Sequence, residues 1–152
     1  MKMNKALKTA LIAAVALTMG GAGSITANAS SWHKGTPKAL RGKYQKHRTS
    51  SAEGFGESIT VSPKKMTISV SNMSGQYVSH LRYKKVGAHL YRLKGHMAHN
   101  GMVLARNVDY AAYRKGKKFA YTDYAYYKKS GFSKYDRAKK VTHFKGNGPI
   151  LK

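Results

Sequence analysis

Residues 58–70 read Ser-Ile-Thr-Val-Ser-Pro-Lys-Lys-Met-Thr-Ile-Ser-Val, and this stretch indicates the fold class. Apolar residues alternate with Ser and Thr on both sides of a Pro63-Lys64-Lys65 break. The alternating apolar positions are Ile59 and Val61 before the break and Met66, Ile68 and Val70 after it. A period of two residues is typical of a strand with one buried face, and proline with two lysines suits a turn. The stretch therefore predicts an antiparallel hairpin.

Similar short segments lie on both sides of this hairpin. Gly42-Lys43-Tyr44 opens a first strand, and residues 77–83 form a strand with Tyr77, Ser79, Leu81 and Tyr83 on one face. Further strands are expected at residues 89–94, 102–110 and 118–121. Turn signals recur about every ten residues, which is typical of an antiparallel barrel or sandwich. We predict an all-β fold.

Two short helices are expected near the ends of the folded region. Pro37 precedes residues 38–40 and suits the first turn of a helix. Residues 133–136, Ser-Lys-Tyr-Asp, resemble a capping box ahead of a helix at 137–140. Residues 141–144 would then form the last strand.

The first 29 residues have the layout of a secretory signal peptide. Three lysines precede an apolar run at 10–19, and Ala27-Asn28-Ala29 matches an A-x-A cleavage site. A membrane span is the alternative, but the run falls short of the roughly 20 residues that a bilayer requires. We expect cleavage after Ala29, leaving 30–152 as one secreted β-barrel domain. With no sorting motif at 148–152, it would be released or held loosely at the cell wall.

The composition excludes several classes of chemistry. The chain has no cysteine, so it has no disulfide, cysteine–zinc site, iron–sulfur cluster or thiol nucleophile. Its carboxylates are Glu53, Glu57, Asp109, Asp123 and Asp136. Asp109 and Asp123 could meet as a glycosidase pair, but ion pairs with nearby lysines are the preferred interpretation. We expect no enzymatic activity and no cofactor.

The basic residues point to an anionic partner. Beyond residue 29 the chain has 26 Lys and Arg against five acids, a net charge of +21. Tyrosines are interleaved with the basic residues of the C-terminal third, an arrangement that suits polyanions. The candidate polyanion-binding residues are Arg114, Lys115, Lys117, Lys118, Lys128, Lys129, Lys134, Arg137, Lys139 and Lys140. The alternative interpretation is a solvated basic face of a barrel.

The type of cation favours a wall polymer over nucleic acid. Lys outnumbers Arg 19 to 7 beyond residue 29, whereas specific readout of bases relies on the planar guanidinium of Arg. We therefore expect an anionic cell-wall polymer, such as teichoic acid, or an acidic polysaccharide, with nucleic acid bound only non-specifically.

His96 and His99 are the only histidines close enough in sequence to suggest a shared metal ion. Two imidazoles in one loop could bind copper or zinc, but no third ligand is evident nearby. Surface histidines in a hairpin loop at 95–101 are the preferred interpretation, so we expect no metal site.

Residues 32–44, Trp-His-Lys-Gly-Thr-Pro-Lys-Ala-Leu-Arg-Gly-Lys-Tyr, resemble the start of mature secreted proteins of lactobacilli. That family opens with W-x-x-G-T-P-x-x-L-R-G-x-aromatic, and residues 83–87 and 91–95 also look like it. The resemblance implies an extracellular protein with a lipocalin-like up-and-down barrel, and it supplies no catalytic residues. Gly42-Lys43-Tyr44 is similar to the G-x-W element of the first lipocalin strand. A barrel of this type offers a second function, carriage or sensing of a small amphiphilic ligand in its interior.

Overall fold

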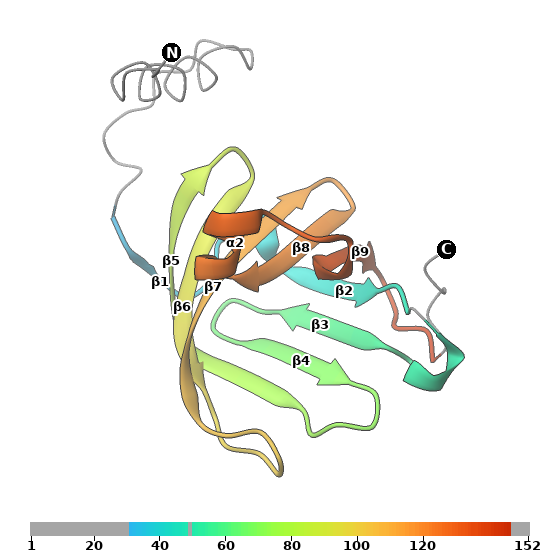
Figure 1. The fold of residues 1–152 in the computed structure, drawn as a ribbon. Coiled ribbons are helices and arrows are strands. Elements are labelled where there is room, and N and C mark those ends of the chain that lie inside the picture. Colours follow the sequence, from blue (N-terminus) through green and yellow to red (C-terminus); the bar gives the residue numbers. More distant parts are fainter. Residues whose placement is uncertain (1–30, 49, 147–152) are drawn as a thin grey trace, which may run out of the picture.

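The computed structural model describes residues 31–48 and 50–146, and this part of the chain consists mainly of β-strands (Figure 1). The predicted signal peptide lies outside the described residues. Within them the strands are β1 His33–Lys34, β2 Gly42–Lys46, β3 Glu57–Val61, β4 Met66–Val70, β5 Gln76–Gly87, β6 Leu90–Met97, β7 Arg106–Lys115, β8 Lys118–Asp123 and β9 Arg137–Val141. The helical segments are the α-helix α2 Tyr124–Ser130 and the 3₁₀ turns η2 Lys38–Leu40, η3 Ser51–Glu53 and η4 Lys134–Asp136.

Eight of these strands close into an antiparallel up-and-down barrel. Each strand from β2 to β8 pairs with the next strand along the chain, and β9 returns to pair with β2. Gln45 of β2 lies opposite Lys139 of β9 at this closure. The short β1 pairs with β5 as an additional strand. The predicted all-β barrel is therefore confirmed, including the hairpin at 58–70, which forms β3 and β4.

The two ends of the barrel differ. The β3–β4, β5–β6 and β7–β8 connections meet at one end, which we name the turn end. The turn η2 also lies there, as expected from Pro37, and it buries Leu40. The β2–β3, β4–β5 and β6–β7 loops and the long β8–β9 connection meet at the other end, the loop end.

Side chains fill the interior of the barrel. The Tyr44 ring stacks on Phe119 with 3.9 Å between the ring centroids, and its hydroxyl donates a 2.6 Å hydrogen bond to the Leu40 carbonyl. The other buried apolar residues of this core are Ile59, Val61, Met66, Ile68, Val78, Leu81, Leu93, Met97, Val108, Tyr110, Ala112 and Ala138. The core thus runs through all eight strands of the barrel.

The strict alternation predicted for residues 77–83 is wrong. Val78 and Leu81 are both buried, although they have opposite parity. The β5–β6 register shifts between Ser79 and Arg82, because β5 carries one extra residue there, and His80 adopts a φ of 51°. Such a bulge reverses the parity of the strand beyond it, and it lets one long strand bend around the barrel.

The helix predicted at 137–140 is also wrong, because these residues belong to β9. The capping box at Ser133 is present, but it begins only the single turn η4. Residues 137–141 pair with both β8 and β2, so the hydrogen bonds that close the barrel override the local helix signal. The last strand accordingly ends at Val141 and does not span 141–144. None of the helices in the described part of the chain is long and apolar enough to cross a membrane.

Candidate functional site: a basic groove on the outer wall

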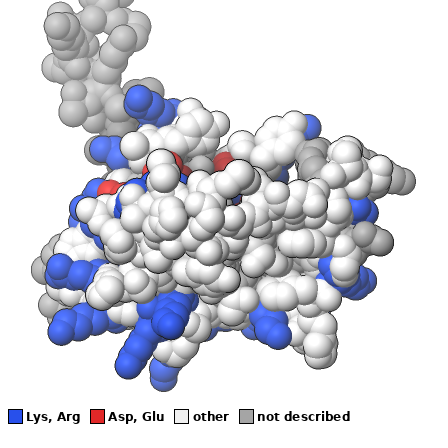
Figure 2. All heavy atoms as spheres, turned by 90° about the horizontal axis from the view of Figure 1, so that it is seen from below, with Lys and Arg blue, Asp and Glu red and all other residues white. Residues whose placement is uncertain are grey.

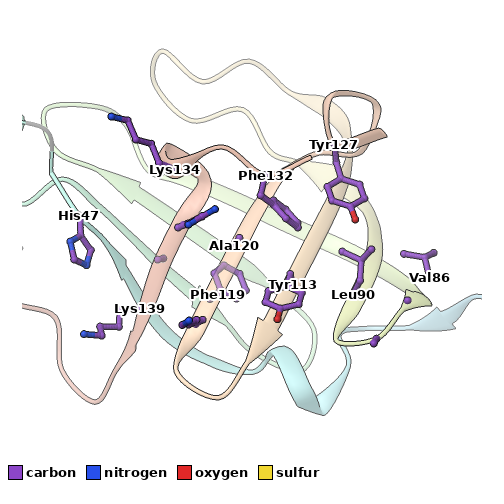
Figure 3. Close-up of a pocket in the computed structure, with 15 residues that line it drawn as sticks. His47, Val86, Leu90, Tyr113, Phe119, Ala120, Tyr127, Phe132, Lys134 and Lys139 are labelled. Atoms are coloured by element: carbon purple, nitrogen blue, oxygen red, sulfur yellow. The ribbon is translucent and has the colours of Figure 1, made fainter. Parts of the chain in front are cut away.

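A groove of about 940 Å³ lies on the outer wall of the barrel. Figure 3 shows residues that line it; most come from the outer faces of β6 to β9 and from the segment after β8, and the rest include His47, Val86 and the core residue Phe119. We name it the outer groove. It exists because the β8–β9 connection folds back toward the strands: α2 contacts both β7 and β8, and the segment continues through Phe132 to η4.

The floor of the outer groove is apolar. Leu90, Tyr113 and Ala120 are successive partners across β6, β7 and β8, and all three line the groove. Phe132 approaches from the connection, with its ring centroid 6.3 Å from Tyr113 and 4.7 Å from Tyr127. This floor was not predicted from the sequence, because Tyr113 and Ala120 occupy outward positions where no apolar periodicity distinguishes them.

The rim of the groove is basic. Lys115 of β7 is the sheet partner of Lys118 of β8, and Lys118 is also the partner of Lys139 of β9. We name these three lysines the basic row; all of them are exposed. Lys118, Lys139, Lys134 and Arg137 line the groove itself, and none of the described lining residues is acidic. The nearby Asp136 carboxylate accepts a hydrogen bond from the Ser133 backbone N–H, as part of the capping box.

The structure brings part of the predicted polyanion-binding set together. Lys118, Lys134, Arg137 and Lys139 line the groove, and Lys115 adjoins them in the basic row. Lys117 is in the β7–β8 turn, exposed Lys128 and Lys129 end α2, and Lys140 is exposed on β9. These four do not line the groove.

Arg114 has a different environment from the rest of the set. Its guanidinium donates hydrogen bonds to the backbone carbonyls of Ala39 at 2.7 Å, Gly116 at 3.2 Å and Arg41 at 3.3 Å. It also lies 5.9 Å from the Tyr44 ring centroid. Because these contacts join η2 to the β7–β8 hairpin, Arg114 closes the turn end of the barrel.

A second polar cluster lies inside the barrel near the loop end. Lys46 Nζ is 3.0 Å from Glu57 Oε2 and 4.7 Å from the Tyr121 ring centroid. The Tyr121 hydroxyl donates a hydrogen bond to Glu57, and the Tyr110 ring packs edge-on against Tyr121. Burial raises the pKa of Tyr110 to about 12. Burial and then the Glu57 carboxylate raise the pKa of Tyr121 well above its usual value.

The polar interior was not predicted, although the sequence held a signal for it. Lys46 shares the parity of buried Tyr44, and Glu57 shares that of buried Ile59. Strand alternation could therefore have placed both charges inside the barrel. An ion pair with satisfied hydrogen bonds is the usual way in which a protein tolerates such charges in its interior.

Asp109 forms an ion pair, as predicted, but its main partner is Arg92 and not a lysine. Arg92 donates to its two carboxylate oxygens at 2.8 and 2.6 Å, and Lys94 Nζ lies 4.0 Å away. The Arg92–Asp109 hydrogen bonds, opposed by partial burial, raise the pKa of the Arg92 guanidinium. Asp123 is the last residue of β8, and its sheet partner is Tyr110.

The two neighbouring histidines lie in different elements. His96 is in β6, not in a loop as predicted, and its Nδ1 lies 3.2 Å from the Asn107 side-chain oxygen. His99 is exposed in the loop beyond β6. Across residues 31–48 and 50–146, no three His, Cys, Asp or Glu residues are grouped so that they could hold a metal ion.

No family model, no curated protein and no solved structure matches this chain.

Proposed function

We propose that this protein is secreted, is not an enzyme, and associates electrostatically with anionic cell-envelope polymers such as teichoic acid or an acidic polysaccharide. The observation that carries the proposal is the basic row. Lys115, Lys118 and Lys139 are neighbours across three strands, with Arg137 and Lys134 beside them and no carboxylate among the described residues that line the groove.

Two physical features of the row support this function. Adjacent strands lie about 4.8 Å apart, so the lysines present positive charges at closely repeated intervals. Like charges that face each other across a sheet are destabilising, and a bound polyanion would relieve that repulsion. Lysine is suited to polyanion binding because its ammonium is a point charge on a flexible stem and requires no particular acceptor geometry.

The proposal is tested with residues 30–152 on purified cell walls. We expect retention on native walls at low salt, release at high salt, and little retention on walls stripped of teichoic acid. Screening shortens to about 3 Å at 1 M salt, so an electrostatic complex must dissociate there. Equal retention on native and stripped walls, or retention that survives 1 M salt, would contradict the proposal.

A second candidate function is the binding of a small amphiphile, and the apolar floor of the outer groove favours it. An apolar core packs inside the barrel, so we propose the outer groove as the site of such a ligand. An acyl chain would lie against Tyr113 and Phe132, and an anionic head group would face Arg137. A fluorescent C16 fatty acid should bind one-to-one, and Phe132→Ser should weaken that binding. Unchanged binding by Phe132→Ser would exclude the groove as the site.

A further inference from the structure

Four large apolar side chains are exposed together near the loop end. Met102 is 74% exposed, Leu104 73%, Met73 54% and Tyr77 51%. Met73 lies in the β4–β5 loop, Tyr77 near the start of β5, and Met102 and Leu104 in the β6–β7 loop. We name these four residues the apolar tip. Contiguous exposed apolar surface on a folded protein indicates an interaction site, whereas scattered single residues do not.

Hydrogen bonds fix the loops that carry the tip. The Asn100 side-chain amide donates a 2.8 Å hydrogen bond to the Gly75 carbonyl, and the Met102 backbone N–H donates to Ser74 Oγ at 3.3 Å. Asn100 and Val103 exchange two backbone hydrogen bonds, of 3.0 and 2.9 Å, across Gly101 and Met102. Gly101 has a φ of +55°, which this tight turn requires. The apolar side chains are therefore presented on an ordered turn.

The tip has the shape and the charge of a membrane-docking element. In Figure 1 the β6–β7 loop projects below the barrel, so its side chains meet a flat surface before the strands do. No acidic residue occurs between residues 58 and 108, and Arg106 is exposed at the base of the loop. The nearest carboxylates along the chain, Glu57 and Asp109, are paired with Lys46 and Arg92. In Figure 2, which views the molecule from below, Lys and Arg lie beside and below a central uncharged area, and some Asp or Glu atoms show at its upper edge.

We propose that the apolar tip inserts into the interface of an anionic lipid bilayer. Met102 and Leu104 enter the boundary between head groups and acyl chains, and Tyr77 lies at the level of the head groups, where amphipathic aromatic rings are favoured. The Arg106 guanidinium, exposed at the base of the loop, is attracted to the negative surface potential. This proposal is independent of polymer binding, because it uses the loop end and none of the residues of the basic row.

The test uses the absence of cysteine from the chain. Met102→Cys provides a single attachment site for an environment-sensitive fluorophore such as NBD. With vesicles containing phosphatidylglycerol, we expect a blue shift and a severalfold rise in emission, and little change with pure phosphatidylcholine vesicles. Lys65→Cys, labelled in the same way, is the matched control, because the β3–β4 turn lies at the opposite end of the barrel and Lys65 does not line the outer groove. It should show no shift.

A second experiment removes the apolar surface without a label. Met102→Ser combined with Leu104→Ser should lower partitioning to anionic vesicles at least tenfold, measured by sedimentation. Tyr126→Ser removes an exposed aromatic residue of α2 and should leave partitioning unchanged. Both variants change exposed positions, so we expect thermal melts like that of the parent protein.

Three results would overturn the proposal. The first is a label at position 102 that does not respond to anionic vesicles. The second is an equal response at position 65. The third is a blue shift that grows with protein concentration in the absence of lipid, which would show that the tip is covered by a second copy of the chain.

Discussion

Gly95 shows how one residue determines the course of β5. A Cβ at this position would lie 2.8 Å from Leu81 Cδ2, Val78 Cγ1 and the Ser79 carbonyl oxygen. The bulge at His80 turns both Val78 and Leu81 inward, and only a residue without a side chain fits opposite them. Glycine at 95 thus allows the interior side of the bulge to pack.

We predict that Gly95→Ala destabilises the protein by about 2 kcal/mol, because overpacking of this kind typically costs 1–3 kcal/mol. Urea denaturation measures the change. Gly146→Ala is the control, since no atom lies within 4 Å of a Cβ there, and it should stay within about 0.5 kcal/mol of the parent. A loss below 0.5 kcal/mol for Gly95→Ala would mean that the bulge relaxes freely.

Tyr110 and Tyr121 predict a stability loss at alkaline pH. Their folded-state pKa values are raised, to about 12 for Tyr110, whereas in the unfolded chain both should ionise near 10. Above pH 10 the unfolded state therefore loses protons that the folded state keeps, and the free energy of unfolding falls as the pH rises. The slope is up to about 1.4 kcal/mol per pH unit for each tyrosine.

The measurement is urea denaturation between pH 8 and 12. As far as these two tyrosines determine it, the free energy of unfolding should be constant up to about pH 9.5 and should then decrease. In Tyr110→Phe the decline should be shallower, because one of the two protons is no longer involved. Both proteins keep Glu57, Asp123 and Arg106, the charged groups that also act on the Tyr110 pKa, so the comparison isolates the Tyr110 hydroxyl. An identical decline in the two would contradict the assignment.

At the scale of single elements, the basic row joins β7, β8 and β9. Its lysines face one another across the sheet, so part of their charge works against the fold. We predict that Lys118→Thr raises the free energy of unfolding slightly, by about 0.2–1 kcal/mol, and weakens binding to native walls. These opposite signs are typical of residues retained for binding rather than for stability.

Thermal denaturation and wall binding of the same variant measure the two effects. Lys65→Thr, in the exposed β3–β4 turn, is the control and should change neither quantity appreciably. If Lys118→Thr binds walls as well as the parent protein does, the row is only a solvated surface.

Individual elements could be predicted where local chemistry decides them. The β3–β4 hairpin follows from alternating apolar residues on both sides of Pro63, and η2 follows from Pro37. The segment at 133–141 could not be predicted in this way. Its capping residues favour a helix, whereas the unpaired edges of β8 and β2 require a strand, and the second requirement prevails.

The whole molecule depends on closure between β2 and β9. Lys46 is the sheet partner of Ala138, and a local sequence pattern cannot predict a pairing between residues so far apart in the chain. For the same reason, the sequence predicted the outer groove only in part. The sequence identified its lysines from their abundance, but the groove above the apolar floor exists only because the β8–β9 connection folds onto the barrel wall. The family resemblance and the signal peptide remain predictions.

We predict that Ala138→Asp unfolds the barrel as a unit. Ala138 is buried in the core and is the sheet partner of both Lys46 and Phe119, so a carboxylate there would be desolvated and would compete with Glu57 for the Lys46 ammonium, at a cost of several kcal/mol. Near-UV circular dichroism should lose its aromatic signal throughout. Ala125→Asp, at an exposed position of α2, is the control and should keep that signal. A folded Ala138→Asp protein would show that β9 is dispensable for closure.

If the outer groove, and not the net charge alone, binds the envelope polymer, two triple variants with the same net charge will differ in binding. One changes Lys118, Lys134 and Lys139 to Gln at the groove; the other changes Lys38, Lys64 and Lys65, exposed residues that do not line it. At fixed low salt, the dissociation constant for purified teichoic acid should rise at least about tenfold for the first and about twofold or less for the second. Equal weakening in both variants would contradict the claim.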